Sequence, residues 1–155
     1  MPKTSAALLL YRHRESVEVL IAHMGGPFWA RKDAGAWSIP KGEHDSDEEP
    51  LAAALREFAE EMGSAPPPGT PIPLGTVKQS GGKTVTTYAV AGDFDLAGFH
   101  SNTFEMEWPR GSGRVREFPE VDRAEWVTID AAREKLVKGQ IPVLDALLAH
   151  LAETS

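Results

Sequence analysis

The segment from Asp47 to Gly63 constrains the fold most, because its pattern fits a helix with one buried side. Asp47 is a suitable N-cap, and Glu48 and Glu49 suit the positive end of a helix dipole. Pro50 falls in the first turn, where its missing N–H does little harm, and Gly63 suits the C-cap. Apolar residues recur at the spacing of one helix face, namely Leu51, Leu55, Phe58 and Met62.

Three glutamates occupy another face of the same helix. At about 100° per residue, Glu57, Glu60 and Glu61 span an arc of about 100°. Like charges this close repel, and a hard cation such as Mg²⁺ would relieve the repulsion because it prefers oxygen ligands. Arg56 lies four residues before Glu60 and could orient that carboxylate. Taken alone, the cluster is more typical of a solvated helix face, since glutamate favours helices.

A longer pattern surrounds these glutamates. Gly42 is followed after five residues by Glu48, and after seven more by the run Arg-Glu-Phe-Ala-Glu-Glu-Met-Gly. In order and spacing, the stretch from Gly42 to Ser64 resembles the Nudix box of the Nudix hydrolase family. Ser64 departs from the bulky aliphatic residue that is usual there. The lead-in Trp-Ser-Ile-Pro-Lys-Gly at residues 37–42 is similar to that of family members acting on dinucleoside polyphosphates and diphosphoinositols.

This resemblance implies the fold and the metal. The fold would be α/β, an α/β/α sandwich with a mixed central β-sheet, formed by one domain over residues 1–155. Glu57, Glu60 and Glu61 would hold Mg²⁺, for which Mn²⁺ could substitute, with help from a backbone carbonyl at or beside Gly42. Arg56 would orient these groups.

The resemblance also implies a further glutamate ahead of a late tryptophan. Glu120, six residues before Trp126, is the candidate for an additional metal ligand or general base. Glu117 is close enough in sequence to be the alternative, and an ordinary loop carboxylate is the plain reading of either residue.

Basic side chains are the candidates for binding substrate phosphates. We single out Lys41, Lys78 and Lys83, each of which could equally be a solvated surface charge. Phe28 and Trp29 could stack on a base, although aromatic side chains more often belong to a core.

Composition limits the partners. The formal net charge of −7 argues against long nucleic acid as a partner, while a small phosphorylated substrate remains compatible with a locally positive site. The chain has no cysteine, which excludes disulfides and thiolate chemistry and fits a reducing compartment. The apolar run at residues 6–10 is too short to span a membrane, so we expect no membrane partner and a cytoplasmic location.

Other periodic segments predict the remaining elements. Residues 5–12 and 17–24 predict a hairpin with one buried strand, and residues 72–79 and 83–91 predict a second hairpin. We expect short strands at 37–40, 103–108 and 125–128, loops at 64–73 and 110–119, and helices at 131–137 and 143–152.

The predicted reaction is attack of metal-activated water on a phosphoanhydride bond of a nucleoside diphosphate derivative, such as a nucleoside triphosphate or dinucleoside polyphosphate. A diphosphoinositol polyphosphate hydrolase is one alternative, and a nucleotide-sensing module without turnover is another, because a fold does not dictate an activity.

Overall fold

The computed structural model describes residues 4–45, 47–78 and 82–154. Its central feature is a seven-stranded mixed sheet, in which five strands follow the order β3-β2-β1-β6-β5, while β4 pairs with β1 and β9 pairs with β2. The strands are β1 (Thr4–His13), β2 (Val17–Met24), β3 (Trp37–Ser38), β4 (Lys41–Glu43), β5 (Ile72–Lys78), β6 (Thr84–Ala91), β7 (Thr103–Glu107), β8 (Val115–Pro119) and β9 (Val121–Thr128). The helices are α1 (Pro50–Met62), α2 (Ile129–Lys135) and α3 (Ile141–Thr154), with short 3₁₀ turns η2 (Leu96–Gly98) and η3 (Lys138–Gln140).

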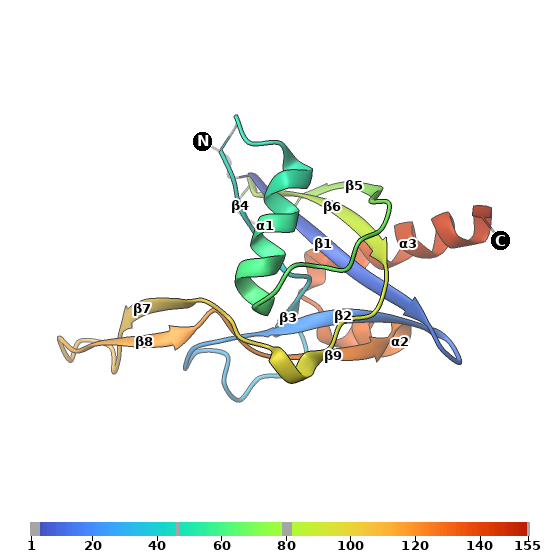
Figure 1. Cartoon of the computed structure of the whole chain (residues 1–155). Coiled ribbons are helices and arrows are strands. Elements are labelled where there is room, and N and C mark those ends of the chain that lie inside the picture. Colours follow the sequence, from blue (N-terminus) through green and yellow to red (C-terminus); the bar gives the residue numbers. More distant parts are fainter. Residues whose placement is uncertain (1–3, 46, 79–81, 155) are drawn as a thin grey trace.

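Helices cover both faces of the sheet, with α1 on one side and α2 and α3 on the other (Figure 1). Alternate residues of β1 serve the two cores, because successive strand side chains point to opposite faces. Leu8 and Leu10 pack toward Phe58 of α1, while Leu9 joins the cluster that contains Leu144 of α3. The α/β/α sandwich with a mixed sheet is therefore confirmed.

In the first hairpin, β1 and β2 pair near the turn that joins them, and the start of β1 pairs with β4, the first strand of the Nudix box. The last residues of β1 pair with β2, but Ser5–Ala7 pair with β4 instead. β2 in turn pairs with β9 over most of its length. Both strands of the hairpin are buried, so the expectation of one buried strand is wrong, because helices cover both faces of the sheet at this point.

Helix α1 ends where the sequence predicts and begins later. Gly63 adopts a left-handed conformation with φ 87°, and its N–H donates to the carbonyl of Ala59 at 2.9 Å, as expected for a C-cap. The N-cap is Glu49, not Asp47, and no side chain caps the helix there. The buried face consists of Ala53, Ala54, Phe58 and Met62, with the predicted stripe residues Leu51 and Leu55 only half-buried.

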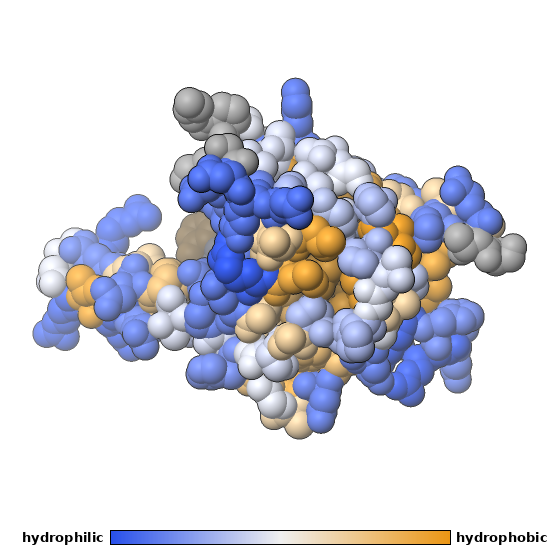
Figure 2. Space-filling model, turned by 45° about the horizontal axis from the view of Figure 1, so that its top comes forward, coloured by the Kyte–Doolittle hydropathy of each residue, from blue (hydrophilic) through white to orange (hydrophobic). Residues whose placement is uncertain are grey.

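Strands β7 and β8 form a separate two-stranded sheet that projects from the body of the molecule (Figures 1 and 2). We call this ribbon, residues 103–119, the arm. The predicted loop at 110–119 is wrong for Val115–Pro119, which pair with β7 from Glu107↔Val115 to Thr103↔Pro119. Strands β4 and the first half of β9 were also not predicted, because both are made by long-range pairing.

Two helices close the chain. They occupy 129–135 and 141–154, close to the predicted ranges. Gln79, the last residue of the predicted strand, and Ser80 and Gly81 of the predicted turn lie outside the described residues. Within the described ranges, no helix combines the length and apolar character needed to cross a membrane.

Candidate metal and substrate site

The three glutamates of α1 differ in exposure, and two of them, Glu57 and Glu60, bind the guanidinium of Arg56. The side chain of Glu57 is 14% exposed, whereas that of Glu60 is 42% exposed. Arg56 donates from Nη1 to Glu57 at 2.9 Å and to Glu60 at 3.4 Å. It also holds Glu48 through two bonds of 3.0 and 2.9 Å. Glu48 therefore contacts Arg56 across the turn before α1 instead of lying within the helix.

Glu61 faces inward beside the start of β4. Its Oε1 accepts a hydrogen bond from the backbone N–H of Lys41 at 3.3 Å. Burial, with further contributions from the charges of Glu57 and Glu120, raises the pKa of Glu61 to about 8. Burial also raises the pKa of Glu57, although the hydrogen bond from Arg56 opposes this shift. These two carboxylates lack the solvation that ordinary surface glutamates have.

Gly42 is required by the close approach of α1. It lies on β4, opposite Ala6 of β1. A Cβ atom at this position would overlap the carboxylate of Glu57. A glycine therefore allows the Glu57 carboxylate to lie against the β4 backbone, which brings a carboxylate and main-chain oxygen atoms to the same place.

Glu120 lies at the root of the arm and is placed by backbone hydrogen bonds. Asn102 N–H donates to the carbonyl of Glu60 at 3.0 Å, and Glu120 N–H donates to the carbonyl of Asn102 at 2.9 Å. Gly25 N–H then donates to the carbonyl of Glu120 at 2.9 Å. We call these three bonds the backbone ladder. It links the last turn of α1, the arm and the glycine loop after β2.

The two late glutamates point to different surroundings. Partial burial raises the pKa of Glu120, and its charge in turn raises the pKa values of Glu57 and Glu61. Both residues are exposed, but Glu117 lies within the arm, paired with Glu105 on β7. The structure therefore brings Glu120, and not Glu117, to the carboxylates of α1.

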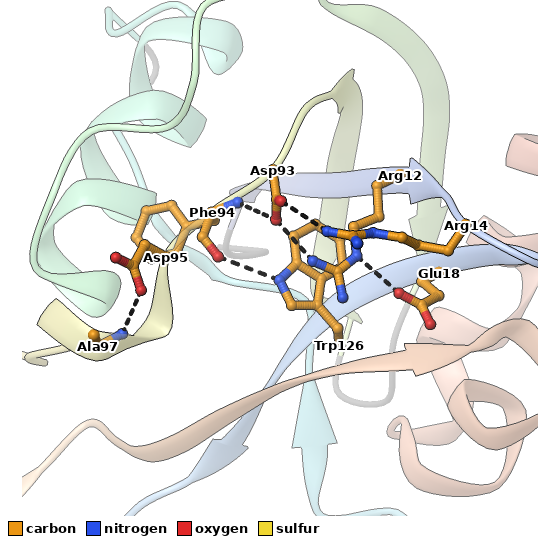
Figure 3. Close-up of polar contacts among 8 residues, drawn as sticks. All are labelled: Arg12, Arg14, Glu18, Asp93, Phe94, Asp95, Ala97 and Trp126. Atoms are coloured by element: carbon orange, nitrogen blue, oxygen red, sulfur yellow. Dashed lines mark hydrogen bonds and ion pairs between the residues drawn. The ribbon is translucent and has the colours of Figure 1, made fainter.

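Trp126, the tryptophan that follows Glu120, anchors β9 to the body of the protein (Figure 3). Its indole N–H donates to the carbonyl of Phe94 at 3.3 Å. Arg12 stacks over its ring at 4.1 Å and forms ion pairs with Glu18 and Asp93. These contacts fix the strand that starts just after Glu120, so Trp126 acts on the site through the position of its strand.

The donor set fits a hard divalent cation. Glu57, Glu60, Glu61 and Glu120 carry carboxylate oxygens, and the β4 backbone at Gly42 lies against the Glu57 carboxylate. Within the described residues, no three acidic or imidazole side chains already form a compact metal cluster. A complete protein cage is not needed for Mg²⁺, which keeps several waters and binds substrate phosphates alongside one or two carboxylates.

A pocket of about 600 Å³ shares Lys41 with this site, since the backbone N–H of Lys41 bonds to Glu61. We call it the lysine pocket, because Lys41, Lys83 and Lys138 line it together with Met24, Trp29, Ser38, Val137 and Gly139. Burial lowers the pKa of Lys41, the charge of Glu61 opposes this shift, and the charge of Lys83 adds to it. Of the three lysines predicted to bind substrate, Lys41 and Lys83 line this pocket. Lys78 lies exposed on β5 and is not among the lining residues.

The two aromatic residues considered for base stacking also differ. Phe28 is 59% exposed, and its ring lies 3.8 Å from the Nζ of Lys32. Trp29 is partly buried against the core on the α3 side of the sheet and also lines the lysine pocket. The sequence left open whether Trp29 packs in the core or could contact a ligand, and in the structure it packs against the core and also lines a pocket.

Sequence reasoning missed Lys138 and Gln140. Gln140 is almost fully buried, and its side chain accepts from Ile39 N–H at 2.8 Å and donates to Ser38 Oγ at 3.0 Å. These bonds bring η3 against the segment that leads into the Nudix box. A polar residue between two helices gives no local signal of such a contact, since its partners are about a hundred positions away.

Comparisons with known proteins agree with this architecture. A model of the NUDIX domain matches residues 1–147. The Ap4A hydrolase of C. elegans, in a binary complex, has a TM-score of 0.67 at 20% identity, covering 96% of this chain and 98% of that chain. The NUDIX domain of NrtR from Shewanella oneidensis, solved with ADP ribose, has a TM-score of 0.68 at 17% identity, covering 97% and 89%.

A NUDIX hydrolase from Nitrosomonas europaea has a TM-score of 0.58 at 20% identity, covering 99% of this chain and 90% of that chain. A comparison with curated proteins gives no match. The structural likenesses establish the fold, and the family model covers all the described strands and half of the last helix. Together with the box at Gly42–Ser64, this match shows that the chain belongs to the Nudix hydrolase family.

Proposed function

We propose that this protein is a Mg²⁺-dependent pyrophosphohydrolase that cleaves a phosphoanhydride bond of a nucleoside diphosphate derivative. The observation that carries the proposal is the pair of poorly solvated carboxylates, Glu57 and Glu61, held against the glycine strand at Gly42. Burying two like charges together is costly unless a cation joins them. The arrangement therefore suits metal binding better than it suits stability.

The residues around these carboxylates would divide the work. Glu57, Glu60 and Glu61 would hold the metal with the backbone at Gly42, while Arg56 keeps Glu57 and Glu60 oriented. Mg²⁺ in this place would supply charge neutralisation on phosphoryl oxygens and a more acidic bound water. Glu120 would accept the proton of the attacking water at its carboxylate or join the metal ligands.

The basic residues would bind the rest of the substrate. Lys41 spans both regions, because its backbone N–H contacts Glu61 while its side chain lines the lysine pocket. Lys83 contributes a second positive charge there. Trp29 offers an aromatic wall on which a base could stack.

Two structural neighbours suggest different substrates. One is named as an Ap4A hydrolase, and the other was solved with ADP ribose. A phosphate-release screen would test the proposal across nucleoside triphosphates, dinucleoside polyphosphates, nucleotide sugars and diphosphoinositols, with Mg²⁺ or Mn²⁺. We expect turnover by the native protein and a loss of several orders of magnitude in Glu61→Gln. Tight nucleotide binding without turnover on any substrate would favour the sensing module instead.

A further inference from the structure

The lysine pocket is positively charged within an acidic chain. The net charge of the chain is −7, yet the described residues that line the pocket include three lysines and no acidic residue. Across the described ranges, none of Lys41, Lys83 and Lys138 forms an ion pair with an acidic side chain. Lys83 and Lys138 are exposed and Lys41 is half-buried, so three positive charges surround one cavity, and this arrangement favours an anion bound among them.

Lys138 is held in the pocket by a fixed backbone. Val137 N–H donates to the carbonyl of Trp37 at 2.9 Å, on one side of Lys138. On the other side, the buried Gln140 bonds to Ile39 and Ser38. The position of the Lys138 backbone is therefore set by contacts with the segment just before Lys41, although the two lysines are far apart in sequence.

The pocket and the carboxylate cluster meet at Lys41. The cluster would hold the diphosphate that is cleaved, so Lys83 and Lys138 are left for other anionic groups of the same molecule. A volume of about 600 Å³ is within the usual range for a small-molecule site and leaves space for further phosphates next to Trp29.

We propose that the lysine pocket binds phosphate groups beyond the cleaved diphosphate, and that Lys138 is a specificity-determining residue for substrates with more than two phosphates. This inference rests on the proposed function for the site of cleavage. It favours polyphosphate substrates, whether nucleotide or inositol in origin, over molecules such as ADP-ribose that carry a single diphosphate.

Binding without metal tests the pocket separately from catalysis. Isothermal titration calorimetry in EDTA would compare inorganic tripolyphosphate with the native chain, Lys138→Gln and a control, Arg14→Gln. Arg14 lies beyond the opposite end of β2 from the pocket residue Met24, where it pairs with Asp93 on the surface. Both variants remove one positive charge, so they match in net charge.

We expect Lys138→Gln to weaken tripolyphosphate binding roughly ten-fold, since a bond between charged groups is lost, and Arg14→Gln to change it less than about two-fold. Lys83→Gln serves as a second pocket variant, and thermal unfolding checks that each variant folds. Equal affinities in native protein and both pocket variants would overturn the proposal.

Kinetics then identify the substrate source. With Mg²⁺, Lys138→Gln should lower kcat/KM roughly ten-fold for diadenosine tetraphosphate or for a diphosphoinositol polyphosphate, mainly through KM, and less than about two-fold for ADP-ribose. An equal loss on ADP-ribose and on the polyphosphates would refute the specificity.

If no substrate is cleaved but tripolyphosphate binding still depends on Lys138, the proposed hydrolysis fails and the anion pocket stands. If cleavage occurs and Lys138 affects neither binding nor kinetics, the hydrolysis stands and this inference fails.

Discussion

Replacing Glu61 by glutamine should stabilise the metal-free protein while abolishing its activity. Burial raises the pKa of Glu61 from the usual 4.5 to about 8, so the folded protein holds a proton that the unfolded chain releases. The folded state therefore binds more protons between these two values, and the free energy of unfolding falls as pH rises through this window. Glutamine keeps an acceptor for the Lys41 N–H without carrying a charge.

The size of the effect follows from the same two pKa values. A rise in pKa from 4.5 to about 8 lowers the free energy of unfolding of the native protein by about 5 kcal/mol once the pH exceeds the folded pKa, and by about 3 kcal/mol at pH 7. For a chain of this length, about 3 kcal/mol raises Tm by roughly 6–12 °C. The difference between Glu61→Gln and native protein should shrink toward pH 5 and vanish only below pH 4.5, where the carboxyl of the unfolded chain is protonated as well.

Differential scanning calorimetry in EDTA across pH 5 to 9 measures the difference in Tm between Glu61→Gln and native protein. Titration with Mg²⁺ should then narrow the difference, because a metal held at about a hundred times its dissociation constant adds about 2.7 kcal/mol to the native protein only. The reasoning is refuted if Glu61→Gln shows the same Tm as native protein at pH 8 in EDTA, or if Mg²⁺ stabilises both proteins equally.

Three further changes test the surroundings of the site. Gly42→Ala forces a Cβ into the Glu57 carboxylate, so it should lower the free energy of unfolding by about 1–3 kcal/mol and remove the stabilisation by Mg²⁺. The control Gly98→Ala, with open space around it, should change neither in the same thermal unfolding experiments. Glu120→Gln should reduce kcat by about 10²-fold or more and Glu117→Gln by less than about two-fold; the reverse order in steady-state assays would contradict the assignment. Gln140→Leu leaves a buried N–H of the preceding strand segment unpaired, so urea unfolding should show a loss of about 1–3 kcal/mol, and an unchanged midpoint would count against this anchor.

The sequence predicted the parts of the molecule that depend on local patterns. The helix at the box, its Gly63 cap and the common face of Glu57, Glu60 and Glu61 follow from spacing within one segment. The family resemblance added the order of the layers and the late glutamate at position 120. The N-cap at Asp47 was wrong because the turn is set by Glu48 pairing with Arg56 instead of by a capping bond.

The missed parts depend on contacts between distant segments. Strand β4 forms because β1 leaves its partner β2 and pairs with Lys41–Glu43, which no local period reveals. Val115–Pro119 carries charges on an exposed ribbon, so its strand lacks the usual alternation of buried and exposed residues. Lys138 reaches the pocket through the bonds of Val137 and Gln140 to the chain near Ser38.

The backbone ladder has a consequence for the order of folding. It joins Glu60 to Asn102 and Gly25 to Glu120, so its bonds close loops of very different lengths across the chain. Long loops cost more entropy to close than a single helix, which can form locally. We therefore expect α1 to form early, with its glutamates on one face, and the complete catalytic geometry to assemble only when the second half of the chain docks. A nascent chain that has emerged only as far as α1 would already display the whole family motif while still lacking a working site.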